Sequence, residues 1–441
     1  MNVGALVLAV LAEFASGCTL HEPKVTPEDL TFEVWPQGLR RADLLFVVDN
    51  SNDTMEMQMV LSRQMVLLVE ELIRRGALDE LLHPGAVDDL HMGVVSIDMG
   101  TGGHEVMTCN EPERGDDGVL QNDGQLPGCN DWYSVDDCED GECPWLEHST
   151  EHPDDGRDPS NPPIWEDFGC IAILGTGGCG FEQPLESSLA ALTRQAEPGG
   201  PNHGFLRDDS VLAVVYITDE DDCSVANSEL LDPARDDFGP MNVRCALNPD
   251  QLHPISRYHD GFLALRPGRE DLVVVAAIAG IPVDGSWSPG DDLESLREMQ
   301  QVDPSNPNHL LPSCATGMGL ALPPVRIVEL VYSFGDHGLL ASCCRSDWRD
   351  ALLALARMIE DNLPDTCVPE PLPEPWRERC RVTELTTDGR QVVVPVGGAS
   401  TAGWSYIPGG TGDRCPSGRI DFTGVDFAGS SDVVVDCERG E

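Results

Sequence analysis

The feature that most constrains the fold is a pair of short, continuous apolar runs that each lead directly into an acidic residue. Leu44–Val48 is apolar throughout and is followed by Asp49, and the very apolar run Val211–Thr218 is followed by Asp219. Strands that are apolar on both faces are typical of parallel sheets covered on both sides by helices. Two further strands are expected at His91–Ile97 and Leu272–Ile278.

Helical patterns alternate with these runs. From Glu56 to Arg75 the large apolar residues recur on one side of a helix, and Gly76 follows it. Further helices are expected at Glu182–Arg194 and Asp347–Asn362. Strands that alternate with helices predict an α/β fold, a doubly wound and mostly parallel, Rossmann-like sheet.

The cysteines indicate an oxidising compartment. The chain has 16 cysteines without the paired spacing of a zinc site, so disulfides are the better interpretation. The N-terminus agrees, because a mostly apolar stretch from Val3 to Phe14 is followed by small residues and Cys18. This arrangement resembles a bacterial lipoprotein signal, in which Cys18 would be lipidated. We therefore expect an exported protein of the cell envelope, anchored to the outer membrane by lipid, or otherwise periplasmic or extracellular.

Composition divides the chain into four parts. Residues 1–18 are expected to be the signal peptide and 19–40 a polar tether. Residues 41–363 are expected to form the α/β domain, with a long Cys-rich insertion at 100–168 that is rich in Gly, Asp and Pro. A Pro-rich boundary leads to a small, disulfide-held, β-rich tail at 364–441.

The charge balance restricts the partners. The chain has 77 acidic and 27 basic residues, a formal net charge of −50. Such a surface repels phosphate backbones, so nucleic acid is not expected as a partner. No stretch after the N-terminus is apolar for long enough to span a bilayer. Contact with a membrane is therefore expected only through the N-terminal lipid.

Three loops carry the candidate chemistry. The first is the segment 49–55, which contains Asp49, Ser51 and Asp53; the second is 175–178, which contains Thr176; the third is the acidic run 219–222, which begins with Asp219. Ligands of open α/β sheets bind beyond the carboxyl ends of the strands, where such loops converge. Oxygen donors without His or Cys suit Mg²⁺ or Ca²⁺ rather than zinc. Taken alone, Asp49 and Ser51 would equally suit a cap of the following helix.

These residues also carry a family resemblance. The segment Leu45–Met55 resembles the first metal-binding loop of von Willebrand factor type A domains, whose pattern is Asp-x-Ser-x-Ser after an apolar strand. The runs 175–186 and 214–224 are similar to later segments of a secreted, lipoprotein-type family found in myxobacteria and related bacteria. The resemblance implies a metal-ion-dependent adhesion site. Ser51 and Thr176 would bind the ion directly, Asp49 and Asp219 would act through water, and an outside carboxylate would fill the open position.

The chain departs from the family pattern at the second serine. Strict counting places Asp53 there, whereas one inserted residue would place Thr54 there. Asp53 would add negative charge and favour Ca²⁺, and Thr54 would preserve the usual hydroxyl in a distorted loop. Both alternatives remain open, with a preference for Asp53.

Two disulfides are expected to stiffen the candidate loops. Cys170 and Cys179 bracket the threonine loop, and Cys223 and Cys245 flank the loop after the acidic run. Either pair would fix a candidate metal loop from outside.

The sequence thus predicts a metal-dependent, adhesion-type binding protein that recognises a protein or another anionic ligand through Mg²⁺ or Ca²⁺. One alternative is a structural scaffold whose metal site is purely stabilising or degenerate. A second, less favoured alternative is a secreted metal-dependent hydrolase. No catalytic motif supports it, because the chain has neither a GxSxG nor an HExxH signature. The protein is therefore not expected to be an enzyme.

Overall fold

The chain forms two compact units, Gln37–Pro364, and Met1–Pro36 together with Asp365–Glu441. The computed structural model describes residues 30–34, 40–52, 54–73, 87–122, 144–149, 164–316, 319–363, 368, 370–386, 390–397, 401–409, 417–423, 425 and 432–438. The expected signal peptide with Cys18, and Asp53, lie outside these residues.

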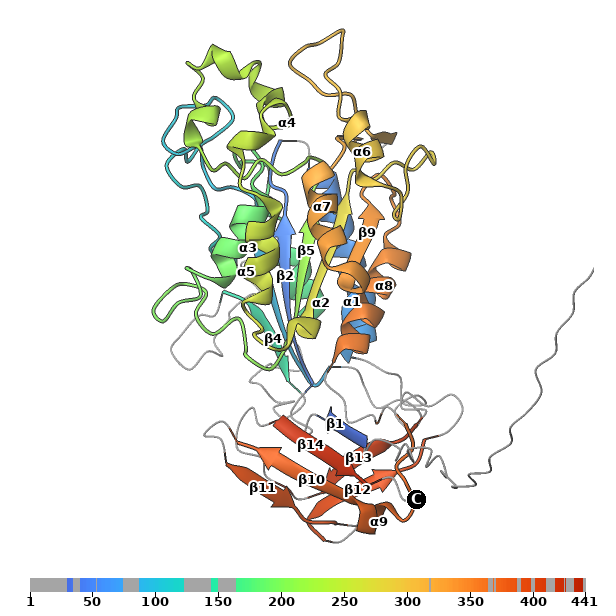
Figure 1. Cartoon of the computed structure of the whole chain (residues 1–441). Coiled ribbons are helices and arrows are strands. Elements are labelled where there is room, and N and C mark those ends of the chain that lie inside the picture. The colour runs from blue at the N-terminus through green and yellow to red at the C-terminus, as the bar shows by residue number, and fades with distance from the viewer. Residues whose placement is uncertain are drawn as a thin grey trace, which may run out of the picture. The chain divides into compact units, whose positions relative to one another are not determined.

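The first unit is built on a six-stranded sheet with the strand order β4-β3-β2-β5-β6-β9. All neighbouring strands are parallel except β4, which is antiparallel to β3. Figure 1 shows the sheet with helices before and behind it. The strands are β2 Arg41–Val48, β3 Asp89–Ser96, β4 Leu146–Ser149, β5 Val211–Ile217, β6 Val273–Ala279 and β9 Gly338–Ser342. The sheet is therefore mixed α/β and mostly parallel, as predicted.

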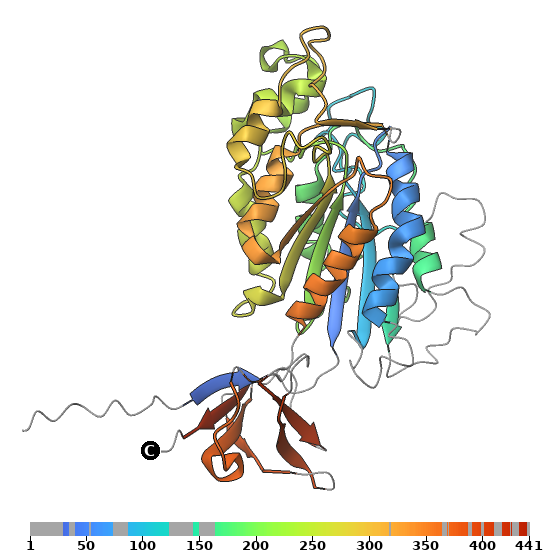
Figure 2. The ribbon, with the colours of Figure 1, turned by 90° about the vertical axis from the view of Figure 1, so that its right-hand side faces the viewer.

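Helices cover both faces of this sheet because its central strands are buried on both sides. One apolar cluster packs α1 Met55–Ile73, α2 Ile164–Ile171 and α8 Arg349–Asn362 against one face. A second cluster packs α3 Pro184–Leu192, α5 Ile255–Leu263 and α7 Val325–Ser333 against the other. The alternation within β2 is typical, since Phe46 belongs to the first cluster and Leu45 to the second. Figure 2, turned by 90°, shows α1 and α8 on one side of the sheet.

Smaller elements lie in the connections that follow β5 and β6. The connection after β5 contains α4 Arg244–Leu247 and four short 3₁₀ turns, at Ser228–Leu231, Asp236–Phe238, Met241–Val243 and Pro249–Gln251. The connection after β6 contains α6 Leu293–Met299 and the hairpin of β7 Cys314–Thr316 and β8 Gly319–Ala321. Single 3₁₀ turns at Glu270–Leu272 and Gly335–His337 precede β6 and β9.

The second unit is β-rich. Its four-stranded antiparallel sheet has the order β1-β14-β10-β11, and β12 pairs with β13 in a separate hairpin. The elements are β1 Leu30–Val34, α9 Trp376–Arg379, β10 Cys380–Leu385, β11 Gln391–Val394, β12 Gly403–Ile407, β13 Arg419–Thr423 and β14 Asp432–Cys437. The Cys380–Cys437 disulfide joins the paired strands β10 and β14. Its apolar core includes Trp376, Trp404 and Ile420.

One expectation needs correction. The predicted tether 19–40 is not a tether throughout, because Leu30–Val34 forms β1 and pairs with β14. The predicted insertion 100–168 contains β4 and the start of α2. Among the described residues no helix is long and apolar enough to cross a membrane.

Candidate functional site

The topology places two of the three candidate loops side by side. From β2 the chain proceeds to β3 on one side and later returns to β5 on the other, so the strand order reverses between β2 and β5. Crevices at such reversals, beyond the carboxyl ends of the strands, are the usual ligand sites of open α/β sheets. Asp49 follows β2 and Asp219 follows β5 by two residues. Both side chains therefore emerge at the switch point.

Hydrogen bonds join the first loop to the third. The backbone N–H of Asp49 donates to the Ile217 carbonyl at 2.9 Å. The Thr218 hydroxyl donates to Asp49 Oδ2 at 2.6 Å, and the Ser51 N–H donates to Asp49 Oδ1 at 2.9 Å. Both carboxylate oxygens of Asp49 thus accept a hydrogen bond, which fixes the carboxylate at the edge of the sheet.

Gln58 of α1 joins the first loop to the second. Its Nε2 donates to the Asp49 carbonyl at 2.7 Å and to the Gly175 carbonyl at 2.8 Å, and its Oε1 accepts from the Gly175 N–H at 3.1 Å. The Gly178 N–H also donates to the Asn50 carbonyl at 3.0 Å. A Cβ at Gly178 would meet Asn50 Oδ1 at 2.3 Å, so a larger residue here would displace the buried Asn50 side chain. Half-buried Thr176 lies in the segment that these contacts position.

Ser51 has the environment expected of a ligand to a cation. Its side chain is buried, and its hydroxyl oxygen is inaccessible to solvent and has no hydrogen-bond partner within the described part of the chain. Buried hydroxyls are normally hydrogen-bonded because desolvation without a partner costs about 1–3 kcal/mol. A metal–oxygen bond would compensate that cost. Thr54, the alternative residue for the second hydroxyl position, instead donates to the Asp49 and Ser51 carbonyls at 2.8 and 3.0 Å.

Further acidic and soft groups meet at this edge that the sequence did not identify. Buried Glu182, just before α3, has a pKa well above its ordinary value because of burial, the negative charges of Glu220 and Asp49, and a hydrogen bond with Glu220. Buried Cys343, just after β9, has a free thiol. Burial and the charges of Asp219 and Asp49 raise the pKa of that thiol. Glu182 lies in the run 175–186 that carries part of the family resemblance, but no local sequence pattern marks it as a site residue.

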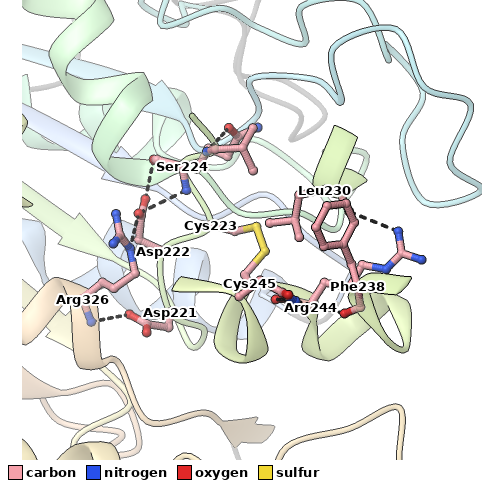
Figure 3. The surroundings of a disulfide bond; sticks show 12 residues. Asp221, Asp222, Cys223, Ser224, Leu230, Phe238, Arg244, Cys245 and Arg326 are labelled. Atoms are coloured by element: carbon pink, nitrogen blue, oxygen red, sulfur yellow. Dashed lines mark hydrogen bonds and ion pairs between the residues drawn. A yellow bond between two sulfur atoms is a disulfide. The ribbon is translucent and has the colours of Figure 1, made fainter. Parts of the chain in front are cut away.

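The acidic run 219–222 has divided roles, as Figure 3 shows. Asp222 accepts from Arg326 Nε at 2.9 Å and from the Leu185 N–H at 3.1 Å. Asp221 accepts from the Arg326 N–H at 2.8 Å, at the start of α7. These two carboxylates hold the third loop against α3 and α7, whereas Asp219 and Glu220 lie toward Asp49 and Glu182.

Disulfides stabilise two of the loops. The expected Cys223–Cys245 pair is present beside the acidic run (Figure 3). The expected Cys170–Cys179 pair is wrong, because Cys179 is bonded to Cys109 and Cys170 forms another disulfide. The segment 97–122 folds back over the glycine loop, where Asn110 Nδ2 donates to the Gly177 carbonyl at 2.9 Å and the Gly180 N–H to the Thr108 carbonyl at 3.2 Å.

Two other groups of side chains could hold a metal by their spacing. The first comprises Asp98, Cys109 and Cys179, but its two cysteines form a disulfide and offer no thiolate. The second comprises Asp89, His91 and Glu147, but Asp89 is ion-paired with Arg207 and Arg41. Neither group therefore competes with the switch point as a cation site.

Comparisons with known proteins do not assign the chain to a family. No family model and no curated protein matches it. Among solved structures it is similar to the human COPII-coat protein Sec24c, with 8% identity, a TM-score of 0.30, and coverage of 96% of this chain and 43% of that one. It is also similar to the open pilus adhesin SpaC from Lactobacillus rhamnosus GG, with 10% identity, a TM-score of 0.30, and coverage of 93% and 41%. The chain thus spans less than half the length of either structure.

Together the fold and the site define a class: a disulfide-bonded α/β protein with a polar, acidic cluster at the switch point of its sheet. The disulfides fit a protein that folds in an oxidising compartment.

Proposed function

We propose that this protein is an adhesion-type binding protein of the cell envelope whose von Willebrand factor A-like unit recognises an anionic ligand through Mg²⁺ or Ca²⁺. The observation that carries the proposal is the buried Ser51 hydroxyl, which has no hydrogen-bond partner among the described residues and belongs to the residue whose N–H donates to the Asp49 carboxylate. A buried hydroxyl that makes no hydrogen bond lowers the stability of the fold, whereas a hydroxyl oxygen beside carboxylates is a favourable set of ligands for a hard cation.

The residues at the switch point fit such an ion. Ser51 and Thr176 would supply hydroxyl oxygens, and Asp49 and Asp219 would supply carboxylates through water, with Asp53 as a further donor. Few direct carboxylates leave a bound cation electrophilic, so that it supplies a position for a carboxylate of a partner. Gln58 would keep the ligands of the first two loops at a fixed spacing, because it is hydrogen-bonded to the backbone of both loops.

The proposed location is the outer membrane, through a lipid on Cys18, with recognition rather than catalysis as the activity. Disulfides within both units support export. No histidine is among the residues gathered at the switch point in the described part of the chain, which favours binding over a hydrolytic mechanism.

One observation favours the structural alternative. Glu182 and Glu220 add carboxylates next to Asp49. If they bound the ion directly, they would fill its coordination shell and leave no position for a partner. A stabilising cation would then be the whole function of the site.

Calorimetric titration of the full chain with Mg²⁺ and with Ca²⁺ tests the proposal. We expect one saturable site that is lost in the Asp49→Ala/Ser51→Ala double variant. The matched control is Asp303→Ala/Ser305→Ala, which removes a similar turn in an accessible loop, where the Ser305 N–H donates to Asp303 Oδ1 at 2.7 Å. Equal heats from the wild type and the Asp49/Ser51 variant would disprove the cation site.

The same titration, continued with acetate or a short acidic peptide, separates the two alternatives. An open coordination position predicts that the carboxylate binds only when the cation is present. Saturable cation binding without any such carboxylate binding would favour the structural role.

A further inference from the structure

The exposed apolar side chains of the α/β unit have an uneven distribution. Among its described residues, every large apolar side chain that is exposed lies in a connection beyond the carboxyl ends of β3, β5 or β6. These residues are Met107, Leu247, Val283, Leu311 and Leu320. Single exposed apolar residues need no explanation, but their restriction to the connections at one edge of the sheet makes that edge the candidate contact surface of this unit.

The two most exposed members lie on segments that are hydrogen-bonded to the neighbourhood of two candidate loops. Met107 is 101% exposed and Leu320 is 58% exposed. Met107 precedes Thr108, whose carbonyl accepts from the Gly180 N–H at 3.2 Å, so it is tied to the Thr176 loop. Leu320 lies on β8, and the Leu322 N–H two residues later donates to the Asp219 carbonyl at 2.7 Å. Each apolar side chain is thus held on a loop that contacts a different candidate metal loop.

Polar contacts connect the segments that follow β3, β5 and β6 into one continuous surface, called the rim below. His104, in the segment after β3, lies 4.0 Å from Asp232 in the connection after β5. The Asn242 N–H of that connection donates to Asn308 Oδ1 in the connection after β6 at 3.3 Å. The rim is therefore a supported surface rather than a set of independent loops.

The rim is also strongly acidic. Residues 218–254 contain nine acidic residues and two arginines, and Arg326 of α7 binds two of the nine, Asp221 and Asp222. Arg244 is buried and donates to backbone carbonyls, and Arg235 is paired with Glu229 and Asp237. A partner that places a carboxylate on the cation must cross this negative rim, so it needs basic side chains around that carboxylate.

We propose that the rim recognises a protein segment in which one acidic side chain is flanked by apolar and basic residues. This inference rests on the proposed cation site and names the partner of that site. The carboxylate reaches the cation, the apolar residues cover Met107 and Leu320, and the basic residues meet the acidic rim. A carboxylate polysaccharide offers the first contact but neither of the others.

Peptide selection tests this inference. The immobilised full chain is panned with a random linear peptide library in Mg²⁺, bound members are eluted with EDTA, and enriched peptides are synthesised for titration. We expect enriched peptides to combine Asp or Glu with large apolar residues and Lys or Arg. Enrichment of acidic peptides without apolar or basic residues, or no EDTA-dependent enrichment, would overturn the inference. So would alginate that competes as well as the selected peptides.

Matched variants separate this inference from the cation site itself. Met107→Ser and Leu320→Ser are each expected to weaken peptide binding about tenfold, as loss of an apolar anchor near an interface centre does. Both should leave the calorimetric binding of Mg²⁺ unchanged, and Val393→Ser, which alters a side chain 55% exposed in the β-rich unit, should change neither. Unchanged peptide affinity in Met107→Ser and Leu320→Ser would refute the surface while leaving the cation site intact. Loss of Mg²⁺ binding in the wild type would refute the proposed function instead.

Discussion

Replacing Ser51 with alanine should change stability in opposite directions with and without the cation. The Ser51 hydroxyl is buried and makes no hydrogen bond to any residue that the structure describes. An unsatisfied buried hydroxyl costs about 1–3 kcal/mol, and the alanine variant removes that cost while leaving only a very small void. We therefore expect Ser51→Ala to raise the free energy of unfolding in EDTA by about 1 kcal/mol.

Saturating cation should reverse this order. A ligand that binds only the folded state at about 100 times its Kd adds about 2.7 kcal/mol to stability. The wild type gains this increment, and the variant, which lacks the hydroxyl ligand, gains much less. The variant should then be the less stable protein, by on the order of 1–2 kcal/mol after its EDTA advantage is subtracted.

Urea unfolding with intact disulfides measures both differences. Tryptophan fluorescence is a suitable signal, because Trp287 and Trp348 are buried in the α/β unit. Ser188→Ala is the matched control, since the Ser188 hydroxyl is also buried but is hydrogen-bonded to Tyr216 at 2.8 Å. That variant should be destabilised equally in EDTA and in Mg²⁺. The reasoning about Ser51 would be refuted if Ser51→Ala behaved like Ser188→Ala.

Three further predictions concern the supporting structure. Burial and the charge of Arg207 lower the pKa of His91, so the folded protein binds fewer protons at this residue than the unfolded chain, and its stability should fall as the pH drops below about 6.5. The variant His91→Asn, which can still donate to the Phe205 carbonyl, should show a flatter dependence of the urea midpoint on pH in that range. Arg244 donates to four backbone carbonyls at 2.6–3.1 Å, so Arg244→Met should lower local stability by about 3–5 kcal/mol and speed hydrogen exchange across 228–248 without altering the exchange of the central strands. Replacing Cys109 and Cys179 by serine should weaken the affinity for the cation, measured by calorimetry, by roughly tenfold, because the disulfide supports the Thr176 loop. An unchanged affinity would show that hydrogen bonds alone hold the Thr176 loop in place.

The core strands could be predicted because their signal is local. β2, β5 and β6 are buried on both faces, so each is a continuous apolar run that is visible in the sequence. The edge strands have weaker signals: β9 is only half-buried along most of its length, and β4 has just four residues. Pairing of β1 with β14 joins residues about 400 positions apart, and no local pattern could reveal it.

Only those residues of the candidate site that follow a recognisable strand could be predicted from the sequence. Asp49, Ser51 and Asp219 each follow a strand, so sheet geometry alone predicts that their loops converge. Glu182 and Cys343 reach the same place from connections whose ends carry no such signal. The Cys170–Cys179 pairing failed for a related reason: proximity in sequence favoured it, whereas the fold brings Cys109 from 70 positions away.

Arginine binds buried carboxylates at both edges of the sheet, and at the carboxyl edge Arg326 Nε donates to Asp222 at 2.9 Å. At the amino edge, buried Asp43 accepts from Arg207 Nε at 2.8 Å, so the protein supplies the positive charge itself. At the carboxyl edge, the charges that act on buried Glu182 are the carboxylates of Glu220 and Asp49, and they raise its pKa instead of compensating it. A chain that places arginine beside Asp43 has the means to neutralise buried acids. The like charges of Glu220 and Asp49 around Glu182 are a second observation that supports the cation proposed for the switch point, and the titration with Mg²⁺ and Ca²⁺ tests it.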